Sequence, residues 1–185
     1  MAGFGLDRGG TGSYNPLFDN LEATGGLGMA IISTGAKAAD FDLKGAQGEK
    51  VSLAAAAGKP AVITFLKSTC PYCQVEAPRL AKALSKNRDK VALLGITCGQ
   101  DTEKDIAQFA KAHGLDLPWG MDPDKRVRQA YGATIVPTVV FVDKDGKVVK
   151  AYEGSTDGLA SAVDQMIASL TGGGPVPEYD ETGSG

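Results

Sequence analysis

Cys70 and Cys73 are the residues of this chain whose type and spacing best suit covalent chemistry. They form a Cys-x-x-Cys arrangement shortly after the apolar stretch 61–66. A stretch rich in β-branched and aromatic residues predicts a buried strand, and Pro71 suits the first turn of a helix, where a missing N–H costs nothing. We therefore expect a strand, a tight turn and a helix, with Cys70 at or just before the helix start and Cys73 one turn further along the same face.

This placement predicts redox chemistry by a dithiol. The unpaired backbone N–H groups and the positive dipole end at a helix start favour an anion, and the thiolate is the reactive form of cysteine. Cys70 is the expected attacking nucleophile and Cys73 the expected resolving thiol. Such an exchange needs no metal ion and no organic cofactor, so we expect neither.

Two other uses of the cysteine pair stay open. A Cys-x-x-Cys can supply half of a zinc site, but such a site needs two further ligands, and the chain offers only Cys98 and the single His113. His113 falls at the end of a predicted helix, on or beside its buried face, where a structural role is expected. The second alternative is a purely structural disulfide.

Composition excludes several classes of protein. With 185 residues, a net charge of −3 and no basic cluster, the chain suits one domain with tails, and we expect no nucleic-acid partner. No stretch is apolar for the roughly 18 residues of a membrane span, so no membrane contact is expected. The glycine-rich first residues lack the basic and apolar regions of a secretory signal. We expect a cytoplasmic protein, or an extracytoplasmic, periplasmic one if the true start differs.

The chain divides into three predicted parts: a flexible Gly-rich segment 1–38, a domain 39–171 and a disordered acidic Gly/Pro tail 172–185. Within the domain we expect these elements in order: short strands at 41–43 and 45–53, strands at 61–66 and 91–97, helices at 102–113 and 124–131, a hairpin at 138–152, and a helix at 156–170. This order predicts an α/β fold, with a central mixed β-sheet flanked by helices on both faces and an N-terminal β-hairpin extension.

From residue 41 to residue 170 the chain resembles the thioredoxin superfamily, most closely the TlpA/ResA-like thiol-disulfide oxidoreductases of the redoxin (AhpC-TSA-like) group. The matching landmarks are Gly58-Lys-Pro, Cys70-Pro-Tyr-Cys73-Gln-Val-Glu-Ala-Pro78, Ala130-Tyr-Gly132 and Val136-Pro-Thr-Val-Val-Phe-Val-Asp-Lys-Asp-Gly146. The resemblance implies a thioredoxin-like fold and a protein-disulfide reductase. Its expected partners are protein disulfide substrates and a thiol electron donor, and we expect a monomer.

The resemblance also implies a surface for the substrate. Pro137 matches a proline that follows a cis peptide bond in this family and faces the cysteine pair. Together with Val136 it is expected to offer a backbone edge to an extended substrate. Thr69, Pro71 and Tyr72 complete the expected contact surface, although Thr69 replaces the tryptophan that is usual before the first cysteine.

Glu76 matches a glutamate that follows the redox pair in TlpA/ResA-like proteins. It lies three residues past Cys73, so it is expected to take the proton of that thiol, and a solvated surface carboxylate is the alternative. Thr64 stands where thioredoxins have a buried aspartate, so their usual proton relay is absent. Cys98 is expected at the same sheet edge as Cys70, either as an auxiliary thiol or, as we favour, as a buried apolar residue.

Three other functions are compatible with parts of the pattern. A peroxiredoxin-type thiol peroxidase resembles this fold but needs Thr or Ser three residues before its reactive cysteine, where this chain has Lys67. Glutathione-dependent chemistry fits the Pro-Tyr dipeptide, which glutaredoxins share. A metal chaperone or binding module of the same fold is the non-catalytic alternative, although such copper chaperones resemble one another in a wider cysteine spacing.

Overall fold

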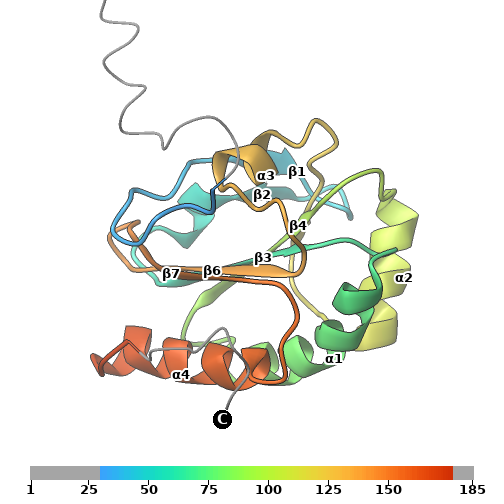
Figure 1. The fold of residues 1–185 in the computed structure, drawn as a ribbon. Coiled ribbons are helices and arrows are strands. Elements are labelled where there is room, and N and C mark those ends of the chain that lie inside the picture. Colours follow the sequence, from blue (N-terminus) through green and yellow to red (C-terminus); the bar gives the residue numbers. More distant parts are fainter. Residues whose placement is uncertain (1–29, 177–185) are drawn as a thin grey trace, which may run out of the picture.

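The apolar stretch 61–66 forms the central strand β3 (Ala61–Leu66), and every residue of this strand is buried in the computed structural model. The structure describes residues 30–176. β3 pairs in parallel with β4 (Ala92–Thr97) and antiparallel with β6 (Thr138–Val142). β5 (Trp119–Gly120) and β7 (Val148–Glu153) complete the sheet in the order β5-β4-β3-β6-β7 (Figure 1). The predicted mixed sheet is therefore confirmed.

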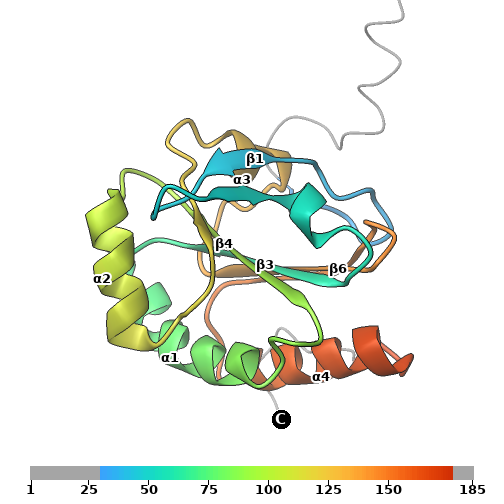
Figure 2. The ribbon, with the colours of Figure 1, turned by 180° about the vertical axis from the view of Figure 1, so that it is seen from behind.

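Side chains of β3 alternate between two cores because successive strand residues point to opposite faces of a sheet. Val62 and Leu66 belong to the core on one face, and Ile63 and Phe65 to the core on the other. Three helices cover the first face: α1 (Pro71–Ser85), α2 (Glu103–His113) and α4 (Leu159–Gly172). Shorter elements cover the second face: β1 (Asp42–Lys44), β2 (Lys50–Ser52), the 3₁₀ helix η1 (Leu53–Ala56) and α3 (Arg126–Ala130) (Figures 1 and 2). Helices on both faces and the N-terminal hairpin are thus confirmed.

Two helices begin later than predicted. α3 begins at Arg126 and not at 124, because Lys125 adopts a left-handed backbone with φ of 58° and the Asp122 carboxylate accepts a hydrogen bond from the Arg128 backbone N–H at 2.9 Å. α4 begins at Leu159 and not at 156. Residues 156–158 form a turn instead, in which the Leu159 backbone N–H donates to the Thr156 carbonyl at 3.1 Å.

The domain also begins earlier than predicted. Residues 30–38 fall in the segment expected to be flexible, yet Ile32 donates a backbone hydrogen bond to Tyr131, Gly35 donates one to Val148, and Ala38 is 2% exposed. This part of the segment packs against the second face of the sheet. The rest of that segment, 1–29, and the end of the predicted tail, 177–185, lie outside the described residues.

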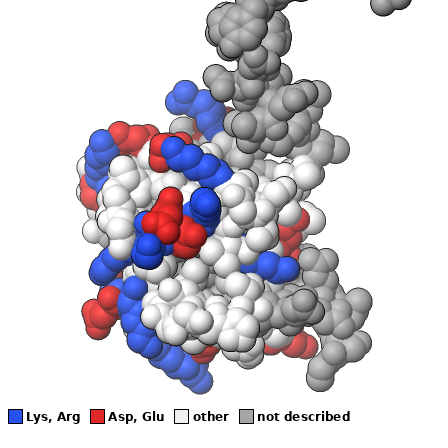
Figure 3. Space-filling model, turned by 90° about the vertical axis from the view of Figure 1, so that its left-hand side faces the viewer, with Lys and Arg blue, Asp and Glu red and all other residues white. Residues whose placement is uncertain are grey.

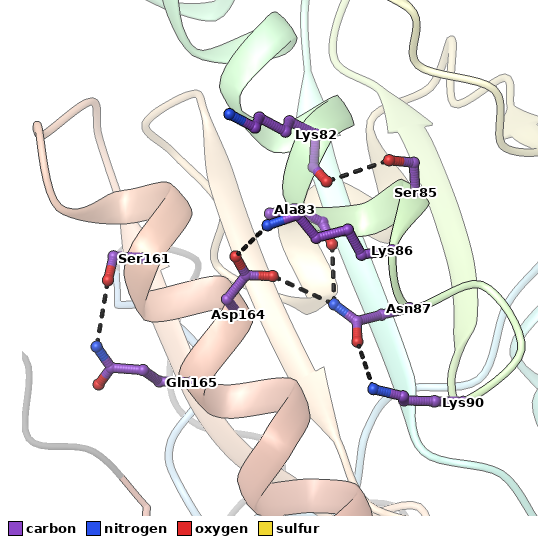
Figure 4. A network of polar contacts seen from close by, with 9 residues as sticks. All are labelled: Lys82, Ala83, Ser85, Lys86, Asn87, Lys90, Ser161, Asp164 and Gln165. Carbon is purple, nitrogen blue, oxygen red and sulfur yellow. Dashed lines mark hydrogen bonds and ion pairs between the residues drawn. The ribbon is translucent and has the colours of Figure 1, made fainter.

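A polar network joins the C-terminal end of α1 to α4 (Figure 4). The buried Asn87 side chain donates to the Ala83 carbonyl at 2.9 Å and to Asp164 Oδ1 at 3.2 Å, and Lys86 Nζ lies 3.4 Å from Asp164 Oδ2. Buried polar groups with partners specify one packing arrangement. The network therefore ties the C-terminal end of α1 to α4, at the end of α1 opposite to the two cysteines.

Charges of both signs lie side by side in the middle of the face shown in Figure 3.

Among residues 30–176, no helix combines the length and the apolar character that a membrane crossing requires.

Candidate functional site

Cys70 lies at the N-cap of α1, as predicted. Its backbone N–H donates to the Lys67 carbonyl at 3.1 Å, which closes the turn between β3 and α1. Its Sγ accepts a hydrogen bond from the Cys73 backbone N–H at 3.5 Å, in the position that an N-cap oxygen usually takes. The side chain is partly exposed, and all three cysteines of the chain are free thiols. The geometry thus combines a donor that stabilises a thiolate with access for a substrate.

Asp101 holds the turn that leads to Cys70. Its carboxylate accepts from the Ser68 hydroxyl at 2.5 Å and from the Ser68 backbone N–H at 3.2 Å. The Gln74 side-chain amide donates to the Ser68 carbonyl at 3.0 Å and ties the turn to α1. Asp101 could not be found from the sequence, because it comes from the loop after β4 and no spacing rule links it to the cysteines.

The other two thiols are buried. Cys73 is 0% exposed, and burial raises the pKa of its thiol far above the ordinary value. Cys98 is 1% exposed, and burial raises the pKa of its thiol to about 12. Cys98 follows β4 at the sheet edge that also carries the Cys70 turn, since its backbone N–H donates to the Leu66 carbonyl at 2.9 Å. Its burial fits an apolar packing role and not an accessible auxiliary thiol.

A loop before β6 forms the wall opposite Cys70. The Val136–Pro137 peptide bond is cis, as predicted, and the Cys70 thiol donates to the Val136 carbonyl with Sγ and O 3.7 Å apart. The Pro137 carbonyl accepts from the Gly154 backbone N–H at 2.7 Å, so the loop before α4 supports this wall. The structure therefore brings the Val136 carbonyl to the Cys70 thiol, and Pro137 follows it across the cis bond.

Glu76 is fully buried, so the surface alternative is wrong. Its Oε1 accepts from the Ser155 hydroxyl at 2.6 Å and from Arg79 Nη1 at 3.2 Å. Its Oε2 is buried and has no hydrogen-bond partner among the described residues. A buried carboxylate oxygen with spare acceptor capacity, one helical turn beyond Cys73, suits a proton acceptor. The helix pattern could not reveal this burial, because Ser155 and the loop around it come from the other end of the domain.

The remaining predicted contact residues lie on the outside of the site. Thr69, Pro71 and Tyr72 are exposed, and Tyr72 is 66% exposed. Val75 and Ile135 are also large apolar side chains that are more than half exposed. Apolar surface of this kind beside a reactive thiol suits contact with a polypeptide.

Thr64, at the position of the family's buried aspartate, is buried, and its hydroxyl donates to the Leu94 carbonyl at 3.4 Å. Within the described part of the chain, no group of three or more His, Cys, Asp or Glu side chains is arranged to hold a metal ion. His113 lies at the end of α2 with its ring 4.7 Å from that of Phe109.

Alkylation of the reduced protein with iodoacetamide at pH 8 is expected to label Cys70 first and to leave Cys73 and Cys98 almost unlabelled. A thiol pKa of about 12 leaves a thiolate fraction on the order of 10⁻⁴ at pH 8 for Cys98, which is also sealed from the reagent. The raised pKa values mean that this selectivity holds from pH 7 to pH 9. Peptide mass spectrometry measures it, and equal labelling of Cys70 and Cys98 in the folded protein would contradict it.

Comparisons with known proteins agree with this geometry. The model of the AhpC/TSA family matches residues 34–151. The chain is 27% identical to the thiol-disulfide oxidoreductase ResA of Bacillus subtilis over 143 residues, which cover 77% of this chain and 75% of ResA. It is 31% identical to the thioredoxin-like protein YneN of the same organism over 126 residues, covering 67% of this chain and 74% of YneN.

A solved structure shows the same arrangement of elements. The crystal structure of a secreted Mycobacterium tuberculosis disulfide oxidoreductase homologous to Escherichia coli DsbE superimposes with a TM-score of 0.63 at 25% sequence identity. The match covers 70% of this chain and 96% of that one. The fold is therefore thioredoxin-like, as predicted.

Proposed function

Because the chain belongs to the AhpC/TSA family, we propose that Cys70 and Cys73 are the catalytic dithiol of a thiol-disulfide oxidoreductase that reduces disulfides in proteins. One observation carries this assignment. Cys70 is partly exposed at the first turn of α1, Cys73 is buried one turn behind it, and the Val136 carbonyl lies opposite. This arrangement separates an attacking thiol from a resolving one.

The reaction follows from that separation. The Cys70 thiolate attacks one sulfur of a substrate disulfide, the substrate S–S bond breaks, and the second substrate sulfur leaves as a thiolate that takes a proton. Glu76 then accepts the proton of Cys73, whose thiolate attacks Sγ of Cys70 and releases the reduced substrate. Two electrons pass to the substrate, and a Cys70–Cys73 disulfide remains. A thiol electron donor restores the dithiol.

The surface around Cys70 supports a protein as the substrate. An extended polypeptide can lie along Val136 and Pro137, where the backbone before β6 faces the thiol. Exposed apolar side chains come from both segments that flank the thiol, with Tyr72 on α1 and Ile135 on the loop before β6. Thr69 and Pro71 complete the contact surface. We propose that the protein acts as a monomer.

We expect the purified reduced protein to accelerate the reduction of insulin disulfides by dithiothreitol and to act more slowly on a glutathione mixed disulfide. The reason is that a polypeptide can contact the apolar surface beside Cys70, whereas glutathione is too small to cover it. The measurement compares kcat/KM for the two substrates. A preference for the glutathione disulfide would contradict the assignment, and rapid hydrogen peroxide consumption by the reduced protein alone would favour the peroxidase alternative.

The direction of electron flow depends on the reduction potential of the Cys70–Cys73 pair. A potential near about −270 mV indicates a reductant, as in thioredoxin, and one near about −120 mV an oxidant. Equilibration with glutathione buffers of known ratio measures it. We propose the reducing direction.

A further inference from the structure

The loop 133–136 places the Val136 carbonyl opposite Cys70, although it belongs to neither a helix nor a strand. We propose that Arg128 is the positioning residue of this loop, and that it sets the substrate-binding edge without touching the substrate. The proposal rests on the proposed function, because it concerns how the same site holds a polypeptide.

Arg128 makes the polar contacts that restrain the first half of the loop. Its Nε donates to the Ala133 carbonyl at 2.7 Å and its Nη2 donates to the Thr134 carbonyl at 2.6 Å. The Thr138 hydroxyl restrains the second half by donating to the Ile135 carbonyl at 2.6 Å. The two Arg128 bonds are short and charge-assisted, and they hold the carbonyls of two consecutive residues. They therefore fix the orientation of the two peptide units that join Ala133 to Thr134 and Thr134 to Ile135.

Arg128 is itself anchored to the central sheet. Its backbone N–H donates to the Asp122 carboxylate at 2.9 Å. Asp122 is 2% exposed, and its own N–H donates to the Thr97 hydroxyl at 3.3 Å, at the end of β4. A continuous set of contacts therefore runs from the carboxyl end of β4 through α3 to the loop that faces Cys70.

Only an arginine can make this contact. The guanidinium is planar and presents several N–H donors in a fixed geometry, so it can bond two neighbouring carbonyls at once. A lysine ammonium has three donors, but they sit on one nitrogen at the end of a flexible stem. It therefore cannot reproduce the fixed spacing of Nε and Nη2 against the two carbonyls. Arg128→Lys therefore keeps the charge and loosens the loop.

A looser loop acts chiefly on binding of the substrate. It meets the thiol at the long hydrogen bond from Cys70 Sγ to the Val136 carbonyl at 3.7 Å. The Cys70 backbone is held by the Lys67 carbonyl, and the donor that stabilises its thiolate is the Cys73 backbone N–H. Neither group lies on the loop 133–136. The edge formed by Val136 and Pro137 would sample more positions, and a polypeptide must then order it upon binding. The cost should appear in KM for a protein disulfide.

The test compares Arg128→Lys with Arg126→Lys. Arg126 lies on the same helix, its side chain is 83% exposed, and its contact is an ion pair at 3.8 Å with Asp124. We expect Arg128→Lys to raise KM for insulin reduction about tenfold, with kcat changed less than about twofold. Arg126→Lys should match the wild type in both. The rate at which iodoacetamide alkylates Cys70 should change less than about twofold among the three proteins, because the thiolate keeps its hydrogen bond from the Cys73 backbone N–H.

The outcomes separate the two proposals. If wild-type protein reduces insulin and Arg128→Lys has an unchanged KM, the positioning role is overturned while the proposed function stands. If kcat and the rate of Cys70 alkylation fall by as much as KM rises, the substitution has damaged the fold in general. That result would also overturn the positioning role. Failure of the wild type to reduce insulin concerns the proposed function alone.

Amide hydrogen exchange tests the positioning role of Arg128 even in that case. The amides of loop 133–136 should exchange faster in Arg128→Lys than in Arg126→Lys, and equal exchange rates would contradict the positioning role.

Discussion

Replacing Cys70 with serine is expected to lower protein-disulfide reduction by at least about a thousandfold, because a hydroxyl at the first turn of α1 cannot form the mixed disulfide. The protein should remain folded. The serine Oγ can accept the same hydrogen bond from the Cys73 backbone N–H, as serine does at many helix N-termini. Turnover of insulin with dithiothreitol measures the loss, and circular dichroism verifies the fold.

Replacing Cys73 with serine should stop the reaction at a different stage. Cys70 still attacks, but nothing resolves the mixed disulfide, so a covalent adduct with the substrate accumulates and is visible on a non-reducing gel. Cys98→Ala is the control, since Cys98 is buried and takes no part in the exchange. It should keep close to wild-type turnover. A Cys70→Ser protein with normal turnover, or adducts that form through Cys73, would refute the assignment of roles.

The junction of β3 and α1 could be predicted from the sequence because its signals are local. A β-branched apolar stretch, a proline suited to a first helical turn and two cysteines in register with that turn are all neighbours in the chain. The capping box of α2, in which Thr102 and Asp105 bond each other, is equally local and was likewise recognisable. Predictions of this kind need no knowledge of the tertiary structure.

The residues that complete the site could not be predicted, because each comes from a distant loop. Asp101 reaches Ser68, Ser155 reaches Glu76, and Arg128 holds the loop opposite Cys70. The late start of α4 has a local cause. The Leu159 backbone N–H donates to the Thr156 carbonyl at 3.1 Å, so residues 156–158 form a turn before the helix begins.

The burial of Glu76 shows the limit most clearly. On a helical pattern, a glutamate beside Pro78 and Arg79 is more often a surface residue. In the structure it faces the loop before α4 and is covered completely. Tertiary contacts therefore changed an apparently ordinary helix position into one with a chemical role.

Glu76→Gln is expected to slow the release of reduced substrate about a hundredfold, which is the usual size of a lost proton acceptor. Glutamine has nearly the same shape and keeps an oxygen for the Ser155 hydroxyl and for Arg79. What it loses is the ability to take a proton from Cys73. The first step, attack by Cys70, should be unchanged. Stopped-flow measurement of mixed-disulfide formation and decay separates the two steps.

The pH dependence of the decay step then distinguishes proton transfer from packing. Burial raises the pKa of the Cys73 thiol far above neutral, so without an acceptor its thiolate fraction increases about tenfold per pH unit from pH 7 to pH 9. Decay in Glu76→Gln should follow this increase, whereas wild-type decay should depend on pH much less steeply. The control is Glu103→Gln, since the Glu103 side chain is 51% exposed and pairs with Lys44 at the surface. Equal pH profiles in wild type and Glu76→Gln would mean that Glu76 only packs, and that Cys73 passes its proton to water or to the leaving thiolate.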